Sequence, residues 1–407
     1  MELRLISDTH EYDAFVEASS HTHYMKTSMW ASIQERSGYQ SQYIGFYNDS
    51  ALVGTGLLLM RKQYGCTYGY IPKGLCIDKE LLPEALELLK EHAKALKLSF
   101  LRIDPDILRM ERDIQGEPIE NGENNEDVTE CLKEHGFRHK GYGYAYDGSW
   151  TNRYTLIIDI SKDMDEIIKG FAKPRQTALK RHKVMHLTTR CGDENDLPDL
   201  CEFEKMLCAI QGFKPHPLSF FKQYLDVFKD HAHLYVTEID LEAMINDTEK
   251  EIASGKYNKD KEALASKQKE LAQANELMTQ YGKQVKIAAG LFLHYGNMSW
   301  DLYTYNHKAF NNHKPVDNLH AFAINDLKTH GVTRYDMCGF SGVTDPKDPY
   351  YGLYTYKRSF GSVYTEYIGQ FDYVLNETVY GLYHKIERII KGVKRRLARM
   401  RYGRKES

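Results

Sequence analysis

Short apolar runs alternate with amphipathic helical patterns along most of this chain, and this alternation restricts the possible folds more than any other feature. Residues 42–49, 51–61 and 68–74 are rich in apolar, aromatic and β-branched side chains, which is typical of strands. Residues 80–97 repeat their apolar side chains at helical spacing, and residues 98–106 are again strand-like. The pattern predicts the α/β fold class, with helices and strands mixed along the chain.

The same rhythm restarts after about residue 150, with a strand predicted over 153–160 and another over 233–240. A chain of 407 residues also exceeds the usual length of one domain. We therefore predict a first unit over residues 1–150. A second unit is predicted over residues 151–240 and 285–384, where the α/β pattern resumes.

Residues 241–284 differ in character, because Lys, Glu, Ala, Gln and Leu dominate them. Apolar side chains recur there at spacings of three, four and seven residues, on both sides of a turn that contains Gly255 and Asn258. These side chains are Leu241, Ile245, Thr248, Ile252, Leu264, Leu271 and Met278. The segment predicts two antiparallel helices that form a coiled-coil arm inserted into the second unit.

Cysteine and histidine spacing argues against a disulfide framework and against a metal site. The seven cysteines are odd in number and form no C-x-x-C pair. Histidine pairs occur at His182 and His186 and at His231 and His233, but no neighbouring Cys, Asp or Glu cluster completes a ligand set. We predict no metal. The start of the chain lacks an apolar signal segment and no later run is long enough to span a membrane, which predicts a cytoplasmic protein.

Residues 385–407 form a densely basic tail in a chain of net charge −3. Its apolar residues, among them Ile386, Ile389 and Val393, share one face of a predicted helix, and Lys and Arg fill the remainder. Such a helix is expected to lie on the anionic inner surface of the membrane. The alternative is that the tail binds the phosphates of a tRNA.

Nucleotide-driven chemistry has no support in the sequence, because the phosphate-binding string G-x-x-x-x-G-K-[ST] is absent. Any acyl group that is transferred must therefore arrive activated, as a thioester or as an ester on tRNA. Residues 138–143 match the R-x-x-G-x-G loop that binds the pyrophosphate of acetyl-CoA. That loop must open a helix, whereas here YAYDGSW follows it, so the acetyl-CoA interpretation is disfavoured.

Residues 335–371, YDMCGFSGVTDPKDPYYGLYTYKRSFGSVYTEYIGQF, carry the most specific signal. They resemble the C-terminal signature of the Fem family of peptidoglycan bridge aminoacyltransferases, a Y-D-x-x-G-[IF]-x-G turn followed by G-L-x-x-[FY]-K-x-x-F and E-Y-x-G. The matching residues are Tyr335, Asp336, Gly339, Phe340, Gly342, Gly352, Leu353, Tyr356, Lys357, Phe360, Glu366, Tyr367 and Gly369. The stretches TSMWASIQERSGY, TYGYIPKG and LRIDPDI are similar to other motifs of the same family, so the resemblance spans the chain.

The resemblance implies two N-acetyltransferase-like units with a coiled-coil arm. It also implies that an amine on the stem peptide of a muramyl pentapeptide precursor, lipid-linked or UDP-linked, attacks the ester of an aminoacyl-tRNA. The amino acid is expected to be Ala, Ser or Gly, and no cofactor is required besides aminoacyl-tRNA as co-substrate. We favour the lipid-linked precursor because of the basic tail. Two other hypotheses stay open, an acyl-CoA-dependent N-acyltransferase of the same fold and a non-catalytic coiled-coil binding protein.

The resemblance assigns two catalytic roles. Asp104 matches the family aspartate proposed as the base that takes a proton from the attacking amine. The residues alone favour a solvated or capping Asp in a D-P-D turn, and the resemblance reverses that preference. Lys357 matches a family lysine that is expected to stabilise developing negative charge. The alternative is that it is a surface lysine on an aromatic strand.

Seven further residues are implied as substrate-binding: Trp30, Gln34, Lys73, Gly74, His216, Tyr303 and Arg358. Two of them depart from the family pattern, because Gln34 stands where a phosphate-binding lysine is expected and His216 stands where an arginine is expected. Both replacements weaken the expected anion site.

Overall fold

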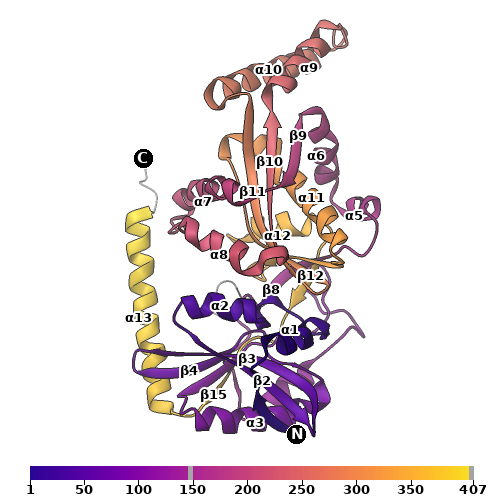
Figure 1. The fold of residues 1–407 in the computed structure, drawn as a ribbon. Helices are drawn as coiled ribbons and strands as arrows, with labels where there is room; N and C mark the ends of the chain where they lie inside the picture. Colours follow the sequence, from indigo (N-terminus) through magenta and orange to yellow (C-terminus); the bar gives the residue numbers. More distant parts are fainter. Residues whose placement is uncertain (145–149, 403–407) are drawn as a thin grey trace.

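The computed structural model describes residues 1–144 and 150–402, the side chains of residues 394–402 excepted. Two mixed sheets with helices on their faces stand one above the other (Figure 1). The α/β fold class predicted from the sequence is therefore confirmed. The boundary predicted at residue 150 lies next to residues 145–149, which are outside the described residues.

The first sheet belongs mainly to the N-terminal unit. Its order is β1 (Glu2–Leu5), β2 (Gln40–Asn48), β3 (Ala51–Gln63), β4 (Cys66–Ile71), β6 (Phe100–Ile103), β15 (Phe371–Val374) and β7 (Arg138–His139), and β5 (Cys76–Ile77) pairs with β3. The helices α3 (Leu82–Ala95) and α4 (Glu126–Glu134) cover one face, where Leu86, Leu89 and Leu132 pack against Ile44 and Leu101. The buried face of α3 follows from the helical spacing of its leucines.

One strand of this sheet comes from the far end of the chain. Strand β15 lies between β6 and β7, antiparallel to both, and Arg102 on β6 forms a buried bidentate ion pair with Asp372 on β15, with both N–O distances 2.7 Å. The sequence-based boundary at residue 384 is thus wrong at this end, since residues 371–374 complete the first sheet. A strand of four residues gave too short a pattern to show its partners.

The second sheet has the order β14 (Val363–Glu366), β8 (Tyr154–Asp159), β13 (Arg334–Gly339), β12 (Met298–Asn306), β11 (Gln284–Tyr295), β10 (Ala232–Asp240) and β9 (Leu187–Cys191). On one face, α5 (Met164–Gly170), α6 (Lys173–Val184) and α11 (Pro315–Thr329) pack. The other face carries α7 (Leu197–Gln211) and α8 (Leu218–Phe228). The short helix α12 (Tyr351–Arg358) precedes β14.

A shared apolar core joins the two units. Helices α1 (Thr9–Ala18) and α2 (Ser28–Arg36) lie between the first sheet and α8 (Figure 1). Their buried side chains, such as Val16 and Ile33, belong to the same apolar cluster as Phe228 and Trp300 of the second unit. The relative position of the two units is therefore set by buried side chains, as in a single rigid body.

The helices α9 (Leu241–Ala253) and α10 (Lys261–Tyr281) form an arm at the end of β10 and β11 that lies farthest from the first unit (Figure 1). Asp240 and Asp260 cap them, each accepting a hydrogen bond of 2.9 Å from the third following N–H. Leu241, Ile245 and Ala274 are buried between the arm and the sheet. The two predicted arm helices and the turn between them are present.

The C-terminal helix α13 (Glu377–Tyr402) starts on the first sheet and extends beside both units (Figure 1). Tyr383 anchors it, 5.4 Å from the ring of Tyr68 and 5.5 Å from that of Phe100. The tail predicted over 385–407 is helical up to residue 402, and its basic side chains after residue 393 lie outside the described part. Within the described residues, no helix combines the length and the apolar character needed to cross a bilayer.

Candidate functional site

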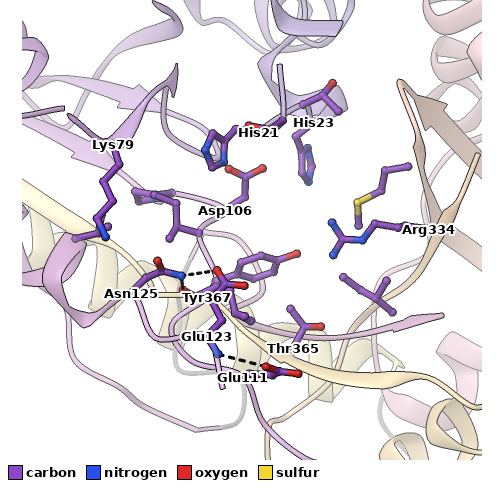
Figure 2. Close-up of a pocket in the computed structure, with 18 of the residues that line it drawn as sticks. His21, His23, Lys79, Asp106, Glu111, Glu123, Asn125, Arg334, Thr365 and Tyr367 are labelled. Atoms are coloured by element: carbon purple, nitrogen blue, oxygen red, sulfur yellow. Dashed lines mark hydrogen bonds between the residues drawn. The ribbon is translucent and has the colours of Figure 1, made fainter. Parts of the chain in front are cut away.

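A cavity of about 970 Å³ separates the two units and is lined by both of them. Figure 2 shows His21, Lys79 and Asp106 of the first unit on one side and Arg334 and Thr365 of the second on the other. Clefts between domains are common sites for ligands of substantial size. The volume suits a ligand far larger than an amino acid.

Charges of both signs line this cavity. Lys79 pairs with Asp127, Arg112 pairs with Glu366, and Asp106 accepts a hydrogen bond of 2.9 Å from the buried ammonium of Lys26. Arg334 is exposed and has no ion pair among the described residues. It is therefore the cation of the cavity best able to bind an incoming anion.

Asp104 lies beside this cavity at the end of β6, and its carboxylate is only 3% exposed. One oxygen accepts a hydrogen bond of 2.7 Å from the backbone N–H of Lys73, and the other accepts from the hydroxyl groups of Tyr70 (3.0 Å) and Thr151. Burial raises the pKa of Asp104, and Lys73 and the three donors oppose that rise. The space that it faces amounts to only about 10 Å³.

The turn that donates to Asp104 has a constrained backbone. Lys73 and Gly74 have φ values of 58° and 74°, and a Cβ at Gly74 would lie 2.9 Å from the Cα of Pro105. The turn therefore requires glycine at the second position. The Lys73 ammonium stands 4.9 Å from the centre of the Tyr367 ring. Asp104 and this turn brace each other.

Lys357 lies at the end of helix α12, so the segment that the sequence suggested as an aromatic strand is helical. The lysine is 9% exposed and is therefore buried rather than on the surface. Its ammonium donates to three successive carbonyl oxygens, those of Met337, Cys338 (3.0 Å) and Gly339 (2.9 Å). Burial lowers the pKa of Lys357. The residue lines a cavity of about 540 Å³ in the second unit.

Asp301 on β12 lines the same cavity, and the sequence reasoning missed it. Burial raises the pKa of its carboxyl to about 6, while the Thr304 hydroxyl, which donates to Oδ1 over 2.5 Å, and then Lys357 oppose that rise. Its Oδ2 lies 3.9 Å from Nε2 of His320. The available signal was a single acidic residue inside the aromatic run WDLYTY.

His320 contributes a neutral imidazole to this cavity. Its side chain is 1% exposed, and burial, followed by the charges of Lys357 and Arg175, lowers its pKa to about 3. Its Nδ1 lies 2.6 Å from the Tyr335 hydroxyl. The Lys357 cavity therefore combines a cation, a carboxylate that titrates near neutrality and an uncharged imidazole.

Of the predicted substrate-binding residues, Tyr303 lies in the Lys357 cavity, and His216 lies beside it. The rings of Tyr303 and His216 are 5.9 Å apart, and His216 Nδ1 is 2.5 Å from Glu204 Oε1. The carboxylate of Glu204 occupies the polar side of His216. The buried carboxylate of Glu204 therefore orients His216. This is not the arrangement expected of the anion-binding arginine that the family pattern places at this position.

Trp30, Gln34 and Arg358 do not line the inter-unit cavity, the Asp104 cavity or the Lys357 cavity. Trp30 packs edge-on against Tyr24 at 5.5 Å within the shared core, and Arg358 lies 5.3 Å from the centre of the Tyr354 ring. Gln34 is half-buried on α2, and its carbonyl accepts from the N–H groups of Ser37 and Tyr39.

The three cavities form a row, with the small Asp104 cavity between the other two. Pro105 and Tyr367 line both the inter-unit cavity and the small Asp104 cavity, and Asn152 lines both the Asp104 cavity and the Lys357 cavity. Buried Asp336 lies near both Lys73 and Lys357, whose charges lower its burial-raised pKa. Asp104 and Lys357 therefore face the same row of cavities, but each lines a different cavity of that row.

Comparison with known proteins identifies relatives along nearly the whole chain. A FemAB family model matches residues 7–388. The lipid II:glycine glycyltransferase of Staphylococcus epidermidis (strain RP62A) is 27% identical, over 96% of this chain and 97% of its own. The protein of the same name from Staphylococcus aureus (strain MRSA252) is 24% identical, over 96% and 97%. The crystal structure of FemX superposes with a TM-score of 0.78 at 24% identity, covering 94% of this chain and 99% of its own.

Proposed function

The chain belongs to the FemAB family, and from this premise we propose that it is an aminoacyltransferase that lengthens the peptide of a lipid-linked cell-wall precursor. The observation that carries the proposal is the cavity that contains Lys357 and Asp301, because the small Asp104 cavity links it to the large cavity between the units. The relatives named as lipid II:glycine glycyltransferases support the same substrate class. Glycine is accordingly the first amino acid to test, before alanine and serine.

The donor in this proposal is an aminoacyl-tRNA, with no further cofactor. The stem-peptide nitrogen attacks the ester carbonyl carbon, a C–N bond forms, and the C–O bond to the terminal ribose of the tRNA breaks. The ribose oxygen leaves and takes up a proton. An alkylammonium has a pKa of about 10.4, so a base must accept a proton before or during attack.

We assign the role of that base to Asp301 rather than to Asp104. Asp301 faces a cavity of about 540 Å³, and its pKa near 6 keeps most of it ionised at pH 7 while leaving it basic enough to accept a proton. Asp104 already accepts three hydrogen bonds and faces almost no open space. Asp104 is then a positioning residue that holds the turn of Lys73 and Gly74.

Lys357 supplies the positive charge of the same cavity. Its three donors are engaged by carbonyl oxygens of residues 337–339, where Cys338 has a φ of 60°. The ammonium therefore holds a strained turn and stabilises negative charge on the attacked carbonyl through space. Such preorganised charge lowers a barrier most effectively in a water-poor cavity.

The lipid-linked precursor is assigned to the inter-unit cavity, with its diphosphate towards Arg334. Helix α13 is suited to meet the membrane that carries this precursor, since Leu382, Ile389 and Val393 are each more than half exposed on it. Lys385, Arg388 and Lys391 are exposed among them. A liposome flotation assay with and without residues 385–407 tests this contact. Equal flotation of both proteins would leave tRNA as the partner of the helix.

The transfer reaction itself is tested by incubating the full chain with lipid II and a mixture of charged tRNAs and weighing the product. A mass gain of one amino acid residue is expected, and pretreatment of the tRNA with mild base, which hydrolyses the ester, should abolish it. If acyl-CoA supports acylation and charged tRNA does not, the enzyme is an acyl-CoA-dependent N-acyltransferase instead.

A further inference from the structure

Four histidines gather on the face of the second sheet that α11 covers. His231 directly precedes β10, His233 lies on β10, His294 lies near the end of β11, and His330 caps the C-terminus of α11. None of them lines the three cavities of the transfer site. The cluster is therefore a separate feature that the proposed function does not use.

Three of the histidines present nitrogen atoms to a common point. One ring nitrogen from each of His233, His294 and His330 lies within 4.8 Å of the other two, and His233 Nε2 is 2.7 Å from His294 Nδ1. A tetrahedral Zn²⁺ with bonds of about 2.0–2.1 Å holds its ligand nitrogens roughly 3.4 Å apart. The hydrogen bond between His233 and His294 must therefore open to that spacing when an ion binds. Among the described residues, no second group of three such side chains converges in this way.

A carboxylate stands behind these rings. Oδ2 of Asp326 on α11 is 4.0 Å from His233 Nδ1 and 3.9 Å from His330 Nε2, and it accepts a hydrogen bond of 2.7 Å from the Tyr235 hydroxyl. His233 therefore directs one nitrogen towards the other imidazoles and its second nitrogen towards an acid. Metal-binding histidines commonly have such a carboxylate on their outer nitrogen.

The fourth histidine adds an unsatisfied nitrogen to the cluster. Nδ1 of His231, whose ring lies 4.9 Å from that of His294, is buried and has no hydrogen-bond partner in the described part of the chain. Imidazole nitrogens that converge in this way are common ligands of divalent transition metals.

We propose that His233, His294 and His330 bind one divalent transition-metal ion, Zn²⁺ first among them, with Asp326 orienting the ligands. The ion would join the end of α11 to strands β10 and β11. Just after His330, the N–H groups of Thr333 and Arg334 donate to the Asn297 carbonyl over 2.9 and 3.1 Å, and Arg334 lines the inter-unit cavity. The metal would thus brace the segment that presents Arg334. The sequence prediction of no metal weighed the His231 and His233 pair without these partners.

The probe is Co²⁺ alone, added to the full-length metal-free protein in the absence of substrates. We expect one Co²⁺ per chain, visible d–d absorption of a tetrahedral site without a thiolate charge-transfer band, and displacement by Zn²⁺. His330→Ala should weaken binding at least 100-fold, and Asp326→Asn should weaken it 10- to 100-fold. The control His10→Ala, on the exposed side of α1, should bind as the natural chain does.

His330 is the decisive position because its side chain is 40% exposed, so its removal leaves the core intact. Zn²⁺ should also raise the melting temperature of the natural chain and not that of His330→Ala. Unchanged Co²⁺ affinity in His330→Ala, a thiolate band in the spectrum, or no binding at micromolar Co²⁺ would each overturn the proposal.

Discussion

Asp104, which is 3% exposed, and Asp301, whose side chain is 11% exposed, both have raised pKa values but differ in their surroundings. Asp104 accepts three hydrogen bonds and faces about 10 Å³ of space, whereas Asp301 accepts one from Thr304 and lines about 540 Å³ beside Lys357. A carboxylate whose oxygens are all engaged stabilises a turn, and one with an open oxygen can take a proton. The comparison teaches that burial alone does not identify a base.

The largest effect is expected for Asp301→Asn. Transfer should fall about 10²- to 10⁴-fold, the usual contribution of a positioned base. The wild-type carboxyl has a folded pKa of about 6, above its unfolded value, so the folded state binds more protons between about pH 4 and 6 and stability declines as pH rises through that window. At pH 7 the variant should therefore unfold at a higher temperature, gaining on the order of 2 kcal/mol. Single-turnover kinetics measure the transfer rate, and calorimetry measures the unfolding temperature. If the variant retains its activity, Asp301 is not the base.

Asp104→Asn should show the reverse balance of effects. An amide has one acceptor oxygen for three donors, so a loss of about 1–3 kcal/mol in stability is expected. The rate should fall roughly 10-fold through displacement of the Lys73 turn. The pH dependence of the remaining activity should be that of the natural chain. A drop as large as that of Asp301→Asn, with stability unchanged, would restore Asp104 as the base.

The acid limb of the pH–rate profile provides a finer test. Activity should rise with pH through about 6, because the base acts only when ionised. The Thr304 hydroxyl lowers the pKa of Asp301, so Thr304→Val should move the limb upward by roughly one pH unit. Thr151→Val, which removes a donor to Asp104 instead, serves as the matched control. A limb that moves only in the control contradicts the assignment.

The smallest effect is expected for Tyr70→Phe, which removes one of the three hydrogen bonds to Asp104. Stability should fall by about 1 kcal/mol, the net value of such a bond, and the rate should stay within about threefold. Chemical denaturation and steady-state assays are sufficient. A rate loss above 100-fold would mean that Tyr70 and Asp104 take part directly in proton transfer.

Local patterns predicted much of the fold because local spacing determines it. The helices of the arm follow from their apolar repeat, and the α/β class follows from the strand and helix rhythm. Strand β15 and helix α12 were missed for a physical reason, since short segments take their form from distant partners. Phe371 pairs with Ile103, and Lys357 is held by carbonyl oxygens about 20 residues earlier.

Only part of the candidate site could be predicted from the sequence, because several of its residues come together only in the folded chain. The family resemblance found Lys357, Tyr303 and Lys73, each of which lines a cavity of the row. Nothing in the run WDLYTY distinguishes Asp301 as a base. Its raised pKa results from burial in the folded chain, beside Lys357. Likewise, His294 and His330 lie far from His233 in sequence, so their convergence depends on the pairing of β10 with β11 and on the path of α11.

The position of β15 has a consequence for synthesis of the chain. The strand that fills the gap between β6 and β7 is made some 270 residues after β6, the separation of Arg102 and Asp372. A nascent N-terminal unit leaving the ribosome therefore carries an open sheet edge until residues 371–374 have been made. A stop codon before residue 363 removes both β14 and β15, so it leaves both sheets incomplete.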